Sequence, residues 1–165
     1  MQDRLSYMVG RNEYITSWLT GKWKQTPFEA QMVPMVFENY HPGASVKDRN
    51  GKELVSPAKK EFLEKEIFRK SGYPENENID HIYMPFDTKR VDFSGFWHFP
   101  CDITFYARAY AECKEDCRQE VELCTCGAVK VWVNGEECAG FYPYEANLEA
   151  RQKAVLPMKK GVNEI

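Results

Sequence analysis

Two stretches of alternating sequence carry the side chains best suited to ligand binding. Residues 101–111 and residues 129–133 each alternate apolar with polar or aromatic side chains, the pattern of a strand with one buried face. If both strands belong to one sheet and expose the same side, their second faces form an aromatic and basic surface. Tyr and Trp rings stack on sugar rings, and Arg donates hydrogen bonds to hydroxyls or carboxylates. The side chains concerned are those of Tyr106, Arg108, Tyr110, Lys130 and Trp132.

A further aromatic stretch adds Trp97 and His98 to these carbohydrate-binding candidates. A second interpretation is purely structural. Residues 1–92 must pack somewhere, and if they lie across the same face they bury it. The surface is then part of the core and not a binding site.

Catalytic and metal-binding patterns are weak in this sequence. The three histidines are scattered, no histidine pair has the spacing of a helical metal site, and no Ser or Cys sits in a nucleophile elbow. A zinc site is conceivable at Cys113, Cys117, Cys124 and Cys126, but C-x3-C followed by C-x-C is not the usual pair of knuckles. We therefore expect no metal, no cofactor and no catalysis by this chain alone.

Composition narrows the classes of partner. The 165 residues carry a net charge of −3 and no basic block, which argues against nucleic-acid binding. No apolar run approaches the roughly 18 residues of a membrane span, and the N-terminus lacks the apolar core of a signal peptide. These features predict a cytoplasmic protein that binds neither nucleic acid nor membrane. In that setting the six cysteines are expected to be free thiols that serve as small apolar groups.

The first half of the chain predicts one strand, one helix and a long irregular segment. Residues 13–20 are β-branched and aromatic and end at Gly21, which favours a strand. Residues 57–71 predict the helix, with an apolar stripe and Ser56 as its N-cap. Residues 72–92 show no clear pattern, so we expect them to be functional or to cover a sheet.

The second half predicts strands throughout. The sharpest signal is residues 129–141, two strands around Asn134-Gly135, which suits a two-residue type I′ turn. A polar connection over residues 112–118 and a strand over residues 119–125 precede it. A further turn is expected at Lys159-Lys160-Gly161.

Several motifs here resemble a known family. Val131-Trp-Val-Asn-Gly135, Gly140-Phe-Tyr-Pro-Tyr144 and the run from Leu156 to Gly161-x-Asn163-x-Ile165 are similar to the galactose-binding-like jelly roll. Gly95-Phe-Trp-His98 resembles the aromatic strand that opens the same module. This sugar-binding domain stands at the N-terminus of many glycoside hydrolases, such as the β-galactosidase and β-glucuronidase group. The family's histidine and paired glycines after the hairpin are missing here, and its catalytic carboxylates lie in another domain.

Together these patterns predict a mainly β chain. We expect a jelly-roll β-sandwich over residues 91–165, with residues 1–90 as an N-terminal extension that packs on it and carries the one helix. Residues 161–165 look like the entrance to a strand, so we expect a fragment of a longer chain with a downstream catalytic domain. The predicted function is that of a non-catalytic, carbohydrate-binding accessory module. The alternative is a structural or oligomerisation domain without a sugar ligand, such as a homodimer.

Overall fold

The structure, a computed structural model, is mainly β. It describes residues 9, 13–27, 46–47, 53–54, 72–83, 90–93, 101–143 and 149–165, and these contain no helix. The prediction of a mainly β chain is confirmed, and the arrangement of strands is consistent with a β-sandwich. The helix expected over residues 57–71 lies outside the described residues, as do Trp97 and His98.

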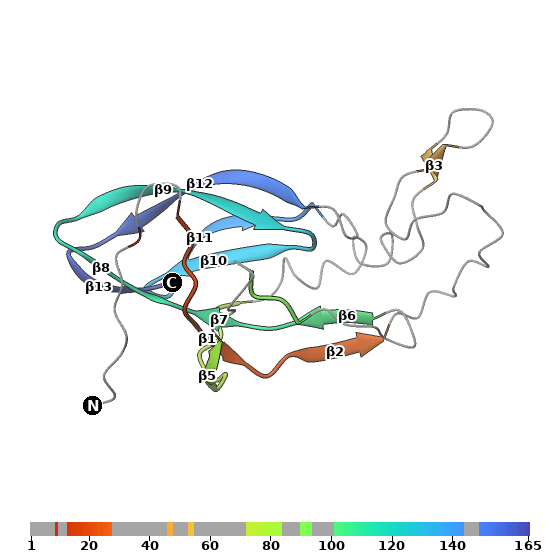
Figure 1. Ribbon diagram of the computed structural model, residues 1–165, viewed down its shortest axis with the longest axis horizontal. Helices are drawn as coiled ribbons and strands as arrows, with labels where there is room; N and C mark the ends of the chain where they lie inside the picture. The colour runs from red at the N-terminus through yellow and green to blue at the C-terminus, as the bar shows by residue number, and fades with distance from the viewer. Residues whose placement is uncertain are drawn as a thin grey trace.

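Six strands in the second half pair in a nested order. The innermost pair joins β10 (Val129–Val133) to β11 (Glu136–Phe141), the next joins β9 (Cys117–Thr125) to β12 (Ala150–Met158), and the outermost joins β8 (Tyr110–Cys113) to β13 (Gly161–Glu164). All three pairs are antiparallel. The ribbon of β8 and β13 therefore turns over at one end and continues as the ribbon of β9 and β12, which lies above it (Figure 1).

The core lies between these ribbons. Val133, Leu156 and Met158 are buried together, from β10 and β12. Partly buried residues of β8, β9, β10, β11 and the C-terminus pack against them: Ala111, Cys113, Cys117, Val121, Val131, Cys138 and Ile165. The prediction of cysteines as small apolar groups is confirmed for three of them, and the five cysteines with described side chains are free thiols.

The β10–β11 hairpin forms as its sequence predicts. Asn134 has φ 53° and Gly135 has φ 86°, the two positive values that a type I′ turn requires. Glu136 pairs directly with Val133, but the register shifts between Val131 and Trp132. The shift is a β-bulge, and it leaves Cys138 as the extra residue.

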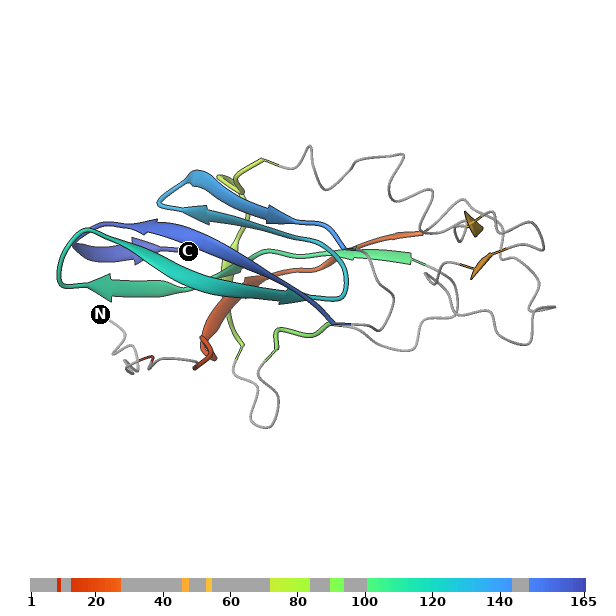
Figure 2. The ribbon, with the colours of Figure 1, turned by 90° about the horizontal axis from the view of Figure 1, so that it is seen from above.

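Strands from the first half pair with the part of the chain that precedes β8. β1 (Trp18–Gly21) lies between β5 (Ile79–Tyr83) and β7 (Ala107–Arg108), and β2 (Lys24–Pro27) pairs with β6 (Cys101–Thr104). A short hairpin joins β3 (Val46–Lys47) to β4 (Glu53–Leu54). Seen from above, the segment that leads into β5 crosses from the side of β10 and β11 towards β1 (Figure 2).

Four boundaries differ from the sequence-based expectation. The strand expected from residue 13 begins at Trp18. The connection expected over residues 112–118 is shorter, because β8 ends at Cys113 and β9 begins at Cys117. The irregular segment 72–92 contains β5, whose polar residues hid the pattern of a strand. The continuous strand expected over residues 101–111 breaks into β6, β7 and β8. It breaks because its neighbour changes along its length, from β2 and β1 to β13.

Candidate functional site

An aromatic and charged cluster lies on the face of β7, β13 and β10 that points away from the core. We name it the Trp132 cluster, and it consists of Tyr73, Arg108, Lys130, Trp132 and Glu164. The rings of Tyr73 and Trp132 meet edge to face, with 6.4 Å between their centroids. The Lys130 ammonium lies 5.9 Å from the Trp132 ring centroid, within reach of a cation–π contact.

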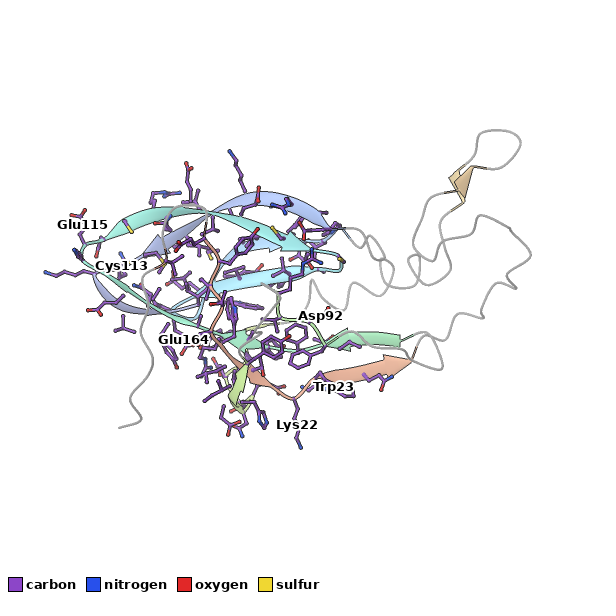
Figure 3. The ribbon with its side chains drawn as sticks, in the orientation of Figure 1. Lys22, Trp23, Asp92, Cys113, Glu115 and Glu164 are labelled. Atoms are coloured by element: carbon purple, nitrogen blue, oxygen red, sulfur yellow. The ribbon has the colours of Figure 1, made fainter. Side chains whose placement is uncertain are left out.

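Glu164 connects the aromatic pair to Arg108. Its carboxylate accepts a hydrogen bond from the Tyr73 hydroxyl, and its other oxygen lies 3.3 Å from Arg108 Nε. The hydrogen bond to Glu164 is the main reason that the pKa of Tyr73 is raised, with burial as a second cause. The Tyr73 hydroxyl therefore stays protonated at neutral pH and remains a donor. Figure 3 labels Glu164 close to β1 and β7, and Glu115 at the turn that joins β8 to β9.

The cluster carries two cations and one carboxylate, and the carboxylate of Glu137 lies beside it. Arg108 pairs with Glu164, and Lys130 Nζ lies 3.2 Å from a Glu137 carboxylate oxygen. The Lys130 side chain is only 5 % exposed, although Glu137 is exposed. Each cation in this part of the structure thus has a carboxylate beside it, and the local charge is balanced.

Tyr73 is brought to the cluster by the segment that precedes β5. Lys24 of β2 makes an ion pair with Glu77, and Gly21 of β1 lies so close to Asn78 that an added Cβ would come within 3.1 Å of the Asn78 carbonyl oxygen. These contacts fix the far end of the segment to β1 and β2. The ring of Tyr73 then reaches Trp132 from outside the sheet.

A buried amide network supports the cluster from beneath. The Asn163 side chain, 0 % exposed, donates to the carbonyl oxygens of Lys159 (2.7 Å) and Gly161 (3.1 Å) and accepts from the Lys159 N–H (2.8 Å). It also accepts from Asn134 Nδ2 at 2.9 Å. The Asn134 backbone and side chain in turn bond both backbone groups of Glu164. The hairpin turn thereby sets the position of Glu164.

The structure brings together three of the seven predicted binding residues. Arg108, Lys130 and Trp132 belong to the Trp132 cluster. Tyr110 is on the same face and lies directly opposite Glu164 in the β8–β13 pair. Tyr106 lies apart, at the break between β6 and β7, where its carbonyl accepts a hydrogen bond from Gly21 of β1.

Tyr73 and Glu164 were not identified from the sequence. The position of Glu164 on the outer face follows from alternation, since Asn163 and Ile165 face inward. No local pattern marks Tyr73, because its role depends on a contact across 91 positions of sequence. Among the described residues, Tyr73 is a point at which the first half covers the predicted surface, since its ring lies against Trp132.

Among the described residues, no group of three or more His, Cys, Asp or Glu side chains could hold a metal ion. The described residues also contain no helix long and apolar enough to cross a membrane.

Comparisons with known proteins give no relative from which function could be transferred. No family model matches the chain, and neither the curated proteins nor the solved structures show a significant similarity to it. The function of the chain is therefore inferred from the geometry of the Trp132 cluster.

Proposed function

We propose that this chain is a non-catalytic carbohydrate-binding module that contacts sugar at the Trp132 cluster. The observation that carries the proposal is the pair of Tyr73 and Trp132 rings beside the Arg108–Glu164 ion pair. Aromatic rings bind the apolar faces of sugars, while guanidinium and carboxylate groups bind their hydroxyls. A partly buried ring flanked by a donor and an acceptor supplies both kinds of contact.

The nested strand pairs support the finer assignment of the fold. A jelly roll is an antiparallel ribbon that folds over on itself, and the pairs β8–β13, β9–β12 and β10–β11 have the nesting that such a ribbon requires. We accordingly propose a galactose-binding-like jelly roll. In this proposal the chain serves a downstream catalytic domain of a glycoside-hydrolase-like protein by holding or positioning substrate.

The test is loss of sugar binding on removal of the central ring. A glycan array with the purified chain identifies a ligand, and calorimetry then compares wild type with Trp132→Ala. Stacking contributes about 0.5–1.5 kcal/mol, and the lost buried area of the ring adds to it, so we expect affinity to fall about tenfold or more. Val155→Ala is the control, since Val155 is an exposed apolar residue of β12, away from the cluster. Equal affinity for the Trp132→Ala variant and wild type would refute the proposal.

A second candidate function is oligomerisation. Two large apolar side chains are strongly exposed, Ile82 on β5 (71 %) and Val162 on β13 (67 %). Contact with a second copy of this chain would remove this apolar area from water and so stabilise a dimer. Light scattering after size-exclusion chromatography tests it. A dimer that Val162→Lys dissociates supports this function, whereas a monomer at all concentrations contradicts it.

A further inference from the structure

The outer face of the sheet continues beyond the Trp132 cluster. Tyr110 lies directly opposite Glu164 in the β8–β13 register, and residues opposite one another in an antiparallel pair project from the same face. Their Cβ atoms are about 4.5–5.5 Å apart in such a pair. Tyr110 is 38 % exposed, whereas Ala109 beside it is buried. The Tyr110 ring therefore stands on the same surface as Trp132, on the opposite side of Glu164.

This surface is longer than one sugar ring. The Trp132 and Tyr73 centroids are already 6.4 Å apart, Glu164 lies next along the row through its bond to the Tyr73 hydroxyl, and Tyr110 follows. One pyranose cannot stack on Trp132 and Tyr110 together, because the strands that carry them lie on opposite sides of Glu164. A ligand that uses both outer rings must be a chain of linked units.

The charge of the surface indicates which chains it accepts. Arg108 is paired with Glu164 and Lys130 with Glu137, so both cations are already neutralised by carboxylates. An anionic sugar would have to displace a carboxylate of the protein or lie beside it, at a cost in electrostatic repulsion. A neutral sugar can bond its hydroxyls to the ion pair without separating it.

From these observations we propose that the surface binds a neutral oligosaccharide, with one unit on Trp132 and Tyr73 and a later unit on Tyr110. The inference rests on the proposed function, since it names the ligand class of the same site. It also assigns Tyr110 a distinct role: Tyr110 contacts long ligands and leaves monosaccharide binding unchanged.

The experiment is calorimetry with ligands of matched chemistry and different length. The probes are gluco-, manno-, xylo- and galacto-hexasaccharides, the four corresponding monosaccharides, and hexagalacturonate as the acidic chain. The variants are Tyr110→Ala, Tyr110→Phe, Trp132→Ala and the control Val155→Ala, which is 37 % exposed on another strand. Circular dichroism verifies that each variant is folded.

We expect at least one neutral hexasaccharide to bind about tenfold or more tightly than its monosaccharide. Tyr110→Ala should remove most of that gain, Tyr110→Phe should retain it, and Trp132→Ala should weaken both ligands. Equal binding of hexasaccharide and monosaccharide, equal behaviour of Tyr110→Ala and Val155→Ala, or a preference for hexagalacturonate overturns this inference while sugar binding at Trp132 stands. If no sugar binds, or Trp132→Ala has no effect, the proposed function fails and the inference fails with it.

Discussion

Removal of the buried Asn163 amide should be among the most destabilising single changes in the described part of the chain. In Asn163→Ala the Lys159 N–H, the Lys159 and Gly161 carbonyls and the Asn134 amide each lose a partner at 2.7–3.1 Å. A hydrogen bond contributes about 0.5–1.5 kcal/mol net, and a buried group left unsatisfied costs more. Four bonds at this value predict a loss of about 2–6 kcal/mol in the free energy of unfolding.

The assay is urea denaturation followed by circular dichroism and tryptophan fluorescence. Asn78→Ala is the matched control, because Asn78 is exposed and its side chain bonds to Asp80, which is also exposed. Exposed substitutions of this kind usually change stability by less than about 0.5 kcal/mol. If Asn163→Ala lies within ~1 kcal/mol of Asn78→Ala, the network does not stabilise the fold as described.

Asn163→Asp separates the two halves of the network. Its oxygens can still accept from the Lys159 N–H and the Asn134 amide, but the carboxylate cannot donate to the two carbonyls and is a buried charge. We expect it to be at least as destabilising as Asn163→Ala at neutral pH. Stability should recover partly in acid, where the carboxyl is protonated and can donate again. A variant as stable as wild type at neutral pH would show that the donated bonds contribute nothing.

Three further predictions concern the turn, the pH dependence and a thiol. Gly135→Ala should cost about 1 kcal/mol because φ is 86°, whereas Gly127→Ala, where an added Cβ meets nothing within 4 Å, should be close to neutral in the same melt. The bond to Glu164 raises the pKa of Tyr73 above its ordinary value of 10.0. The stabilisation from this hydrogen bond is therefore complete below pH 10 and is lost as the pH rises through the pKa of Tyr73 in the folded chain. The difference in unfolding free energy between wild type and Tyr73→Phe should shrink above pH 10. A difference that stays constant with pH would contradict this. Burial raises the pKa of the Cys138 thiol, so iodoacetamide should alkylate it more slowly in the folded chain than in urea, as mass spectrometry would show; equal rates would contradict its burial.

Local sequence determines those features that depend on neighbours in the chain. The Asn134-Gly135 turn was predictable because type I′ geometry needs two positive φ values, and few residue pairs adopt them readily. Alternation likewise predicted that Val133 faces the core and that Trp132 does not. Such rules act over a few residues and do not require knowledge of the partner strand.

The composition of the site depends on register, which the sequence does not reveal. Arg108 and Trp132 belong to one cluster because β13 places Glu164 between them. The position of Glu164 is set by its pairing with Tyr110 and its bonds to Asn134. The contact of Tyr73 depends on how the segment before β5 crosses the sheet. The sequence did not predict β5, because apolar and polar residues do not alternate in it. Asp80 and His81 are both polar, and Ile82 falls on the exposed face.

The nesting of strand pairs also has a consequence for the order of folding. The β10–β11 hairpin closes only two residues, and once it forms it brings the ends of β9 and β12 near each other, which in turn brings β8 towards β13. Each closure after the first then orders a short effective loop, so the entropic cost is spread over small steps. We expect the strand pairs to form in order, from the hairpin at Asn134-Gly135 outward to β8 and β13. In such a route Gly135→Ala slows folding, whereas Asn163→Ala, at the outermost pair, acts mainly by accelerating unfolding.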